Sequence, residues 1–406
     1  MKIPFSPPYI DESVVNEVVD ALRSGWITTG PKVKALESEI MNLTGTKAAL
    51  GVNSWTSGAT MMLHWLGVKP DDEVIIPAYT YCATALAVLW AGAKVVMVDS
   101  GDDFNISVDA IRKAITPHTK AIIPVDIAGF PCDYEAIMAL VNEPGIRSLF
   151  KPESDVQSRL GRILVLNDSA HSLGAKYKEQ YAGTNTDITI FSLHAVKNVT
   201  TAEGGMICFN MPEPFDNEQL YKEMRLMTLN CQTKDAFTKS QAGGWRYDIV
   251  GKGMKVNMAD VNTAIGLAQI RQYDKLLVER KRIYEAYDAA FSKHEWALLP
   301  PSHTGKKESS YHVYALRIKD FTEQQRDEMI KVISQSEVAV NVHFVPLPML
   351  SYFKELGFDI AHYPNAFRHY EHEISLPVYP QLDEEKVNFV IKTVVEAYQT
   401  IAAQSI

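Results

Sequence analysis

One lysine in this 406-residue chain lies in a segment whose composition suits a reactive amine. Lys197 follows the β-rich run 189–193 and precedes two threonines and the glycine pair Gly204-Gly205, after which the chain becomes apolar again. The pattern predicts strand, loop and strand, with the lysine in the loop. Most lysines are solvated surface charges, but small, hydroxylated neighbours and a glycine pair let other backbone approach this one closely. Lys197 is therefore a candidate for Schiff-base chemistry.

A second segment, about one strand and helix earlier, supplies a matching acid. The apolar run 163–166 predicts a buried strand that ends at Asp168, and His171 follows three residues later. A carboxylate beside the pyridine nitrogen of pyridoxal phosphate (PLP) keeps that nitrogen protonated, so that the ring can accept electrons. A lysine and an aspartate at neighbouring strand ends are the minimum set for such chemistry. The two segments together favour PLP as the cofactor.

Both segments resemble those of the PLP-dependent sugar aminotransferases of the DegT/DnrJ/StrS family. The resemblance rests on Phe191-Ser-Leu-His-Ala-Val-Lys-Asn-Val-Thr-Thr-Ala-Glu-Gly-Gly205, Asn167-Asp-Ser-Ala-His-Ser-Leu-Gly174, 24–31 and 253–260, and it runs over nearly the whole chain. Within the family, the chain is most similar to the branch that makes UDP-4-amino-4-deoxy-L-arabinose from a UDP-4-keto-pentose. The resemblance implies an α/β fold of PLP-dependent aminotransferase fold type I. In that fold a mainly parallel central sheet is covered by helices, and a smaller α+β domain follows at the C-terminus.

The resemblance also implies roles for individual residues. Lys197 forms the internal aldimine with PLP and then moves a proton as a general base, while Asp168 holds the pyridine nitrogen. The implied cofactor contacts also include Thr56, Ser57, Tyr81, His171, Ser192, Lys255 and Asn257. The last two are implied to reach across the interface of a homodimer with shared active sites. Substrate contacts are implied for Thr28, Thr29 and His343.

Several of these residue types also have ordinary structural roles. Thr56 and Ser57 begin a predicted helix, where hydroxyl and N–H groups bind a phosphate but also serve as simple N-caps. Tyr81 suits either stacking on the pyridine ring or filling the core. The resemblance places His343 at the mouth of the site, but a lone histidine in a strand is more often a polar contact.

The implied reaction is the transfer of an amino group from glutamate to a nucleotide-linked 4-keto sugar, with a UDP-4-keto sugar as the best match. Alternatives with the same fold are a cyclitol aminotransferase and a PLP-dependent sugar dehydratase, which carries histidine where this chain has Lys197. An alternative of another class is a non-catalytic PLP-binding regulatory protein. Asp126 stands where the family usually has histidine, which predicts altered substrate contacts or an altered polar network near the ring.

Short β-branched runs alternate with helical patterns up to Asp168, which predicts a mainly parallel sheet covered on both faces. The pattern changes after Asp274, so we expect a large PLP-binding domain at 1–275 and a small domain at 276–406. The elements expected in the later part are a helix at 275–294, strands at 311–318 and 338–344, and a helix from Asp383 onward. Two segments are expected to be irregular, namely a surface excursion at 141–162 and a long loop at 226–250.

Bulk properties exclude several classes of protein. A net charge of -9 and a pI near 5.7 argue against nucleic acid or an anionic membrane surface as the main partner. The cysteines have neither the spacing of a metal site nor that of a paired motif, so reduced thiols and no metal are expected at Cys82, Cys132, Cys208 and Cys231. No apolar run is long enough for a signal peptide or a membrane span, which predicts a cytoplasmic enzyme with small-molecule substrates.

Overall fold

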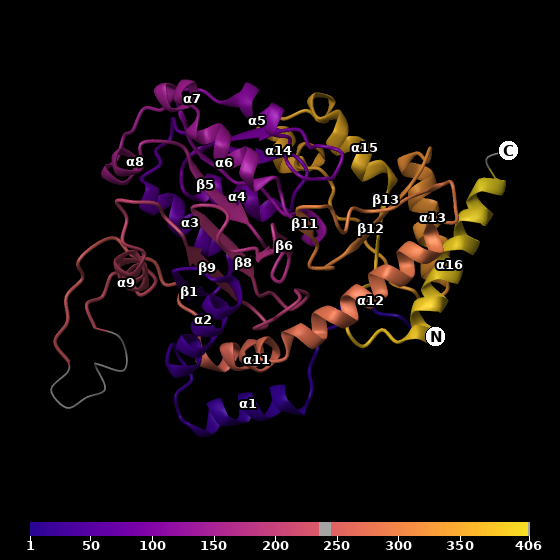
Figure 1. The fold of residues 1–406 in the computed structure, drawn as a ribbon, viewed down its shortest axis with the longest axis horizontal. Helices are drawn as coiled ribbons and strands as arrows, with labels where there is room; N and C mark the ends of the chain where they lie inside the picture. Colours follow the sequence, from indigo (N-terminus) through magenta and orange to yellow (C-terminus); the bar gives the residue numbers. More distant parts are fainter. Residues whose placement is uncertain (235–244, 405–406) are drawn as a thin grey trace.

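The computed structural model describes residues 1–234 and 245–404, and a seven-stranded sheet forms its centre (Figure 1). In spatial order the strands are β1 (Ala48–Val52), β9 (Gly205–Phe209), β8 (Ile188–Ser192), β5 (Leu164–Asp168), β4 (Thr119–Ile122), β2 (Glu73–Pro77) and β3 (Lys94–Val98). Neighbouring strands are parallel except where β9 is involved, because β9 runs opposite to both β1 and β8. The predicted α/β fold with a mainly parallel sheet is confirmed.

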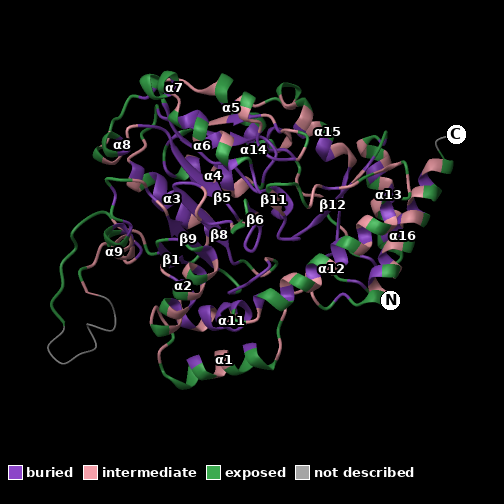
Figure 2. Cartoon of the chain, viewed as in Figure 1, coloured by how far each residue is buried: buried purple, intermediate pink, exposed green. Residues whose placement is uncertain are grey.

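Both faces of the sheet carry apolar side chains, as expected for parallel strands that lie under helices. In β8, Ile190 faces the side covered by α3 (Trp55–Leu66) and α4 (Cys82–Trp90), while Phe191 faces the other side. That other side is covered by α2 (Pro31–Thr44), α11 (Asp260–Ile270), α5 (Val108–Ala114) and α6 (Tyr134–Asn142). Figure 2 shows the sheet buried between helices whose outer sides are exposed. This double cover explains why the strands are continuous apolar runs.

Two further helices lie at one end of this layer. Helix α1 (Glu12–Arg23) packs on α11, and α9 (Asn217–Met227) packs beside β1 (Figure 1). Asp260 at the start of α11 ties this region together, since its carboxylate accepts from the N–H groups of Gly30 (2.9 Å) and Val33 (3.1 Å). The carboxylate therefore satisfies N–H groups at the start of α2 that have no partner within the helix.

The long helix α12 (Tyr273–Phe291) leads from the central sheet to a second, smaller core (Figure 1). That core surrounds an antiparallel sheet and two helices, namely β10 (Ala297–Leu298), β12 (Tyr314–Ile318), β13 (Glu373–Leu376), α13 (Glu323–Gln335) and α16 (Glu384–Ala403). The N-terminus returns to it, because Ile3 bridges to Val338 and is fully buried there. The domain limits 1–275 and 276–406 stay a prediction.

Some later elements contact the central sheet region instead. Helices α14 (Ser351–Glu355) and α15 (Pro364–His372) contribute Phe353 and Tyr370 to the core under α3 and α4. A third small sheet joins early and late segments, and its strands are β11 (Lys307–Glu308), β6 (Lys176–Tyr177) and β7 (Gln180–Tyr181). The C-terminal part of the chain therefore lies directly against the carboxyl ends of the central strands.

Residues 141–162 differ from the predicted surface excursion. They contain the short helices α7 (Pro144–Leu149) and α8 (Asp155–Leu160). Gln157 in α8 is fully buried, and its side-chain amide donates to the carbonyl of Leu66 at 3.2 Å. The segment is therefore partly built into the fold, because a buried amide needs a hydrogen-bond partner that only a fixed backbone provides.

Residues 338–344 do not form the predicted strand. Val338 and Asn341 make single bridges to Ile3 and Ser375, with no continuous ladder on either side. The apolar alternation has another cause, since Val338 packs in the small core while Phe344 packs in the core under α3 and α4. The segment therefore crosses between two cores rather than lying in a sheet.

The remaining predicted elements differ mainly in their limits. The helix predicted at 275–294 spans 273–291, the strand predicted at 311–318 begins at residue 314, and Asp383 is the N-cap of α16. The loop predicted at 226–250 begins after α9 ends at Met227, and Gln232 bridges to Ile249. Residues 235–244 of that loop lie outside the described residues.

Candidate active site

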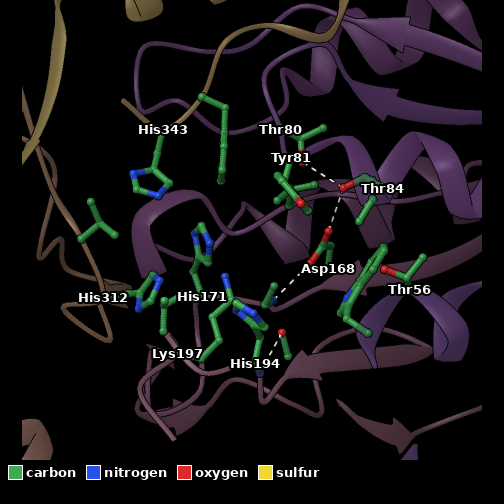
Figure 3. A pocket seen from close by; sticks show the side chains of 18 of the residues that line it. Thr56, Thr80, Tyr81, Thr84, Asp168, His171, His194, Lys197, His312 and His343 are labelled. Atoms are coloured by element: carbon green, nitrogen blue, oxygen red, sulfur yellow. Dashed lines mark hydrogen bonds between the residues drawn. The ribbon is translucent and has the colours of Figure 1, made fainter. Parts of the chain in front are cut away.

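A cavity of about 440 Å³ lies at the carboxyl ends of the central strands (Figure 3). In open α/β sheets these ends are where the loops gather functional side chains. Asp168 ends β5, Ser192 ends β8, and Lys197 follows in the loop after β8. The cavity is completed by residues from distant segments, among them Phe5, Thr56, Thr80, Tyr81, His171, His312, His343 and Phe344. Stretches that are far apart in the chain therefore build one site.

The loop that carries Lys197 is fixed by backbone hydrogen bonds. Leu193 closes it, because its carbonyl accepts from Thr201 N at 2.8 Å and its N–H donates to the Gly204 carbonyl at 2.9 Å. Helix α11 adds a further contact, since Gln269 Oε1 accepts from Thr200 N at 2.8 Å. Burial lowers the pKa of Lys197 to about 8, although the Asp168 charge acts in the opposite direction. The amine is therefore partly uncharged near neutral pH, which is the nucleophilic form.

Asp168 is almost fully buried beside the lysine. Its Oδ2 accepts from the Thr84 hydroxyl at 2.9 Å, and its Oδ1 accepts from Ala170 N at 3.1 Å (Figure 3). Burial raises the pKa of Asp168 to about 7, while those two donors and the Lys197 charge lower it. Its neighbours therefore orient the carboxylate but give it no strong cationic partner. The protonated pyridine nitrogen of a bound PLP would supply one.

Three histidines surround the lysine, and burial lowers the pKa of each (Figure 3). The rings of His171 and His312 lie 4.4 Å apart, and His171 also stacks on Phe344 at 5.8 Å. Asn198 Oδ1 lies 2.8 Å from His312 Nδ1, and an amide oxygen only accepts, so the proton sits on Nδ1. The three rings are therefore neutral and leave Lys197 as the main source of positive charge among these groups.

The start of α3 borders the cavity and suits an anion. The first N–H groups of a helix have no partner within it, and they carry the positive end of the helix dipole. Ser54 is the N-cap, and Thr56, in the first turn of the helix, lines the cavity. The backbone of β9 lies close to the start of α3 here, since a side-chain carbon at Gly205 would lie 2.7 Å from the Ser54 carbonyl carbon. Ser192 lines the same cavity.

The sequence-predicted residues divide into two groups. Those that line the cavity are Thr56, Tyr81, Asp168, His171, Ser192, Lys197 and His343. Ser57 does not line it, because its hydroxyl donates to Asn53 Oδ1 at 2.5 Å. Tyr81 keeps an exposed ring, with 60% of its surface accessible, next to Phe344 at 5.9 Å.

Besides Ser57, four predicted residues lie outside the cavity of this chain. Asn257 Nδ2 donates to the Thr29 hydroxyl at 2.6 Å, and that hydroxyl donates to the Met258 carbonyl at 2.5 Å. Lys255 is exposed and donates to Asn257 Oδ1, while Thr28 accepts from Asp260 N through its carbonyl at 3.1 Å. Asn257 bridges to Val52 at the end of β1, so the group lies along the outer edge of the central sheet.

Asp126 is buried behind the cavity rather than in it. Its carboxylate accepts from five donors, namely Cys132 N, Tyr134 OH, Asn167 Nδ2, Ser169 Oγ and Ser172 Oγ. Two of these donors, Ser169 and Ser172, flank His171 in the chain. Asp126 therefore fixes the turn after Asp168 and has no direct contact with the cavity, which favours the altered polar network over altered substrate contacts.

Several residues that line the cavity were not among those predicted from the sequence. Thr84 lies one helical turn after Tyr81, and this spacing at the start of a helix could have identified Thr84 as a residue on the same side. His312 and Phe5 have no such clue, because they come from segments far from the lysine in the chain and are placed only by the fold. His194 and Glu203 also line the cavity, with 3.6 Å between Nε2 and Oε1.

These residues fit PLP. The start of α3 suits the phosphate, Asp168 the ring nitrogen and Lys197 the aldehyde carbon. In addition, His171 Nδ1 is buried and has no hydrogen-bond partner within the described structure. Among residues 1–234 and 245–404, no three metal-ligating side chains gather around a common point. No helix in the described part combines the length and apolar composition that a bilayer crossing requires.

Comparison with known proteins gives a consistent result. The profile of the DegT/DnrJ/EryC1/StrS aminotransferase family matches residues 8–150 and 155–395. The structure is similar to the PMP-form of the putative sugar aminotransferase Spr1654 from Streptococcus pneumoniae, with 42% identity, a TM-score of 0.94 and coverage of 98% of this chain and 100% of that one. A PLP-form of the same protein gives 40% identity, a TM-score of 0.93 and coverage of 99% and 100%. The family gap at 151–154 falls between α7 and α8.

Two further relatives extend the comparison. Helicobacter pylori PseC, an aminotransferase involved in the biosynthesis of pseudoaminic acid, gives 25% identity and a TM-score of 0.86, covering 98% of this chain and 100% of that one. The spore coat polysaccharide biosynthesis protein SpsC of Bacillus subtilis is 33% identical over 398 residues, which are 97% of this chain and 96% of that protein.

Proposed function

The chain belongs to the DegT/DnrJ/EryC1/StrS aminotransferase family and is a PLP-dependent sugar aminotransferase, and from that premise we propose its two substrates. The amino donor is glutamate, and the acceptor is a nucleotide-linked 4-keto sugar, with a UDP-4-keto sugar as the first candidate. The observation that supports this proposal most is the meeting of Lys197 and Asp168 in one cavity. The branch that acts on a UDP-4-keto-pentose remains the proposed nearest relative.

Lys197 has two tasks in this proposal. Its Nζ binds the cofactor, and once an amino donor takes its place the free amine moves a proton at the donor carbon. PLP supplies the electron sink that stabilises the negative charge at that carbon. Burial, which lowers the pKa of Lys197 to about 8, keeps a share of the amine neutral for the second task.

The other cavity residues hold and orient the cofactor. Asp168, oriented by Thr84 and Ala170, keeps a negative charge next to the ring nitrogen. We assign the phosphate to the start of α3 with Thr56 and Ser192, one face of the ring to Tyr81, and a supporting contact to His171. Ser57 keeps a supporting place in this assignment through its hydrogen bond with the N-cap Ser54.

The pathway is proposed from the relatives. By their names, one acts in spore coat polysaccharide biosynthesis and another in the biosynthesis of pseudoaminic acid. We therefore propose that this enzyme supplies an amino sugar for a surface polysaccharide or lipopolysaccharide. We keep the prediction that it works in the cytoplasm, where cysteines stay reduced; all four cysteines are free.

The second subunit is part of the proposal. Lys255 and Asn257 lie at the outer edge of the central sheet, outside the cavity of their own chain. We propose that in a homodimer these two residues reach the partner's cofactor or substrate, and that Thr28, Thr29 and His343 contact the sugar. The division into domains 1–275 and 276–406 is kept, with the cavity between them.

Two alternatives are less well supported. A sugar dehydratase of this fold has histidine at the lysine position, and this chain has Lys197. A non-catalytic PLP-binding protein does not need the oriented carboxylate of Asp168. A cyclitol aminotransferase keeps the same site, so only the choice of acceptor separates it from the proposal.

The test is a spectrum of the PLP-loaded protein before and after glutamate, followed by a panel of UDP-, dTDP- and GDP-4-keto sugars and a cyclitol ketone. We expect glutamate to bleach the visible absorbance and one UDP-4-keto sugar to restore it. Lys197→Ala should lose both the absorbance and the turnover, whereas Lys331→Ala, an exposed lysine on α13, should keep both. Substantial turnover in Lys197→Ala would contradict the assignment of the lysine.

A further inference from the structure

His343 lines the cavity, and its polar atoms on the side away from the cavity make hydrogen bonds. Its N–H donates to Glu373 Oε2 at 2.9 Å, and its carbonyl accepts from the Tyr79 hydroxyl at 2.5 Å. Its ring stacks on Phe5 with 5.5 Å between centroids, and Nδ1 lies 2.8 Å from Ser375 Oγ. Among the described residues, no side chain or backbone group hydrogen-bonds to Nε2. His343 therefore offers one free ring nitrogen to the cavity (Figure 3).

Behind the histidine, Ser375 leads to a buried carboxyl group. The Ser375 hydroxyl is hydrogen-bonded to Glu373 Oε1, and no part of the Glu373 side chain reaches solvent. Both residues lie in β13, so the strand places them on the same side as the His343 ring. The three side chains form one chain of hydrogen bonds from the His343 ring in the cavity to a carboxyl group inside the protein.

Opposing effects act on the pKa of Glu373, so that this carboxyl group changes its protonation state not far from neutral pH. Burial raises its pKa to about 8, while the Ser375 hydroxyl, the His343 N–H and the cations Arg326 of α13 and Arg317 of β12 lower it. The Tyr79 hydroxyl, from the segment after β2, also faces the carboxyl group, and burial raises the pKa of that phenol so far that it stays neutral. Glu373 is therefore the group in this chain of hydrogen bonds that can exchange a proton.

His343 by itself is a poor base. Burial and the charge of Lys197 lower the pKa of its ring to about 3, so an imidazolium is disfavoured there. A neutral imidazole can still take a proton at one nitrogen if it gives up the proton on the other. Ser375 and Glu373 are placed to receive that second proton.

The hydrogen bonds allow two directions with the same heavy-atom positions. With Glu373 ionised, Ser375 donates to the carboxylate and accepts from His343 Nδ1–H, so Nε2 is an acceptor. With Glu373 protonated, the carboxyl donates to Ser375, the hydroxyl donates to Nδ1, and Nε2 carries the hydrogen. The His343 N–H donates to Glu373 Oε2 in both states. The two states differ by one proton, which enters at Nε2 and leaves Glu373 neutral.

We propose that Ser375 and Glu373 are positioning residues that make His343 a proton relay, so that a proton taken from the cavity at Nε2 ends on Glu373. The relay gives the cavity a base besides Lys197 when Glu373 is ionised and a hydrogen-bond donor when it is protonated. Its use on the keto sugar rests on the proposed function. The relay itself does not, because it consists only of residues of this chain.

The test is the tautomer of His343 in protein without cofactor, measured by NMR of ¹⁵N-histidine-labelled chain. Protonated and unprotonated ring nitrogens resonate in separate regions, and loss of the signal in His343→Asn assigns it. We expect hydrogen on Nε2 at pH 6 and on Nδ1 at pH 9.5. The same tautomer at both pH values would overturn the relay.

Two variants and one control sharpen the test. Glu373→Gln keeps the shape of the protonated acid, since its amide can donate to Ser375, so His343 should hold hydrogen on Nε2 at both pH values. Ser375→Ala breaks the chain but keeps the Glu373 carboxyl group, so the His343 tautomer should no longer follow pH. Glu371→Gln removes a nearby charge outside the chain and should behave as the unaltered protein.

A pH-dependent tautomer in Glu373→Gln or in Ser375→Ala would assign the change to another group and sink the proposal. The measurement needs no substrate and no cofactor, so its result is independent of whether the glutamate and keto-sugar assay succeeds. Failure of the relay leaves the proposed function standing, and failure of the assay leaves the relay standing.

Discussion

At the scale of single residues, a substitution at Asp168 can separate the effect of its charge from the effect of its shape. Asp168→Asn keeps an oxygen for the Thr84 hydroxyl or the Ala170 N–H, but a neutral amide cannot stabilise a protonated ring nitrogen. A hydrogen bond to a charged group contributes about 1.5–3 kcal/mol, so we expect both half-reactions to slow by roughly 10- to 100-fold. Single-turnover absorbance measurements with glutamate, and then with the keto sugar, give the two rates.

The control for Asp168 leaves its charge in place. Thr84→Val removes one donor to the carboxylate but not the carboxylate itself, so its half-reactions should slow less than those of Asp168→Asn. Equal losses in the two variants would mean that orientation, rather than charge, is what Asp168 contributes.

The buried lysine predicts a pH dependence for cofactor capture. Burial disfavours the charged amine and lowers the pKa of Lys197 to about 8, so the neutral amine becomes abundant as the pH rises through that value. We expect the rate at which cofactor-free protein binds PLP covalently to rise with a midpoint near pH 8, followed by stopped-flow absorbance. The Asp168 charge holds the pKa of Lys197 up, so Asp168→Asn should move the midpoint lower. A midpoint near the ordinary lysine value would contradict the burial argument.

At the scale of elements, the lysine loop depends on one side chain of α11. Gln269 is buried, its Oε1 accepts from Thr200 N at 2.8 Å, and its Nε2 donates to the Tyr9 carbonyl at 2.6 Å. Gln269→Leu leaves the buried Thr200 N–H unpaired, which costs about 1–3 kcal/mol, and removes the partner of the partly buried Tyr9 carbonyl. We expect a lower free energy of unfolding in denaturant titrations and weaker PLP binding, because the loop that holds Lys197 loses its anchor.

The matched control lies just beyond the end of α11, at the N-cap of α12. Gln272→Leu removes an amide that donates to the exposed Ser13 hydroxyl and partly exposed Asp11, where water can replace it. Its stability and PLP affinity should stay close to those of the unaltered protein. A similar loss of PLP affinity in both variants would show that α11 as a whole, rather than Gln269, supports the loop.

The elements also show how far sequence reasoning reaches. The ends of β5 and β8 were predictable, because continuous apolar runs break at polar residues where parallel strands end, and Asp168 and Ser192 lie there. The strand predicted at 338–344 was wrong, since a period of two also arises when a segment crosses from one core to another, as Val338 and Val340 pack in the small core while Val342 and Phe344 pack under α3 and α4. Helix α8 within 141–162 was missed because its buried Gln157 is polar and the side-chain partners of Gln157 are backbone groups, which leave no pattern in the sequence.

At the scale of the whole molecule, the cavity combines the N-terminus, the central sheet and the C-terminal part. His312 and Phe5 were not predictable as site residues, because no local pattern marks them and only the path of the chain brings them to Lys197. The hydrogen bond of Asn198 to the Ser310 carbonyl at 2.8 Å shows how the lysine loop and the C-terminal part are joined. Site residues of this kind follow from tertiary structure alone.

The proposed homodimer makes the last prediction, which tests whether two chains share a site. Lys197→Ala removes the lysine from its own cavity, and Asn257→Ala removes the residue proposed to reach the partner's cavity. A mixed dimer then holds one site with both defects and one site with neither. Random mixing gives half of the molecules this composition, so about a quarter of the unaltered activity should return when the two inactive proteins are unfolded and refolded together. The control mixes Lys197→Ala with Asp168→Asn, two residues of one cavity, and should not rise above the residual activity of Asp168→Asn, because every site in a mixed dimer then has one defect. No recovery in the first mixture, with dimers present by light scattering, would place Asn257 outside the partner's site.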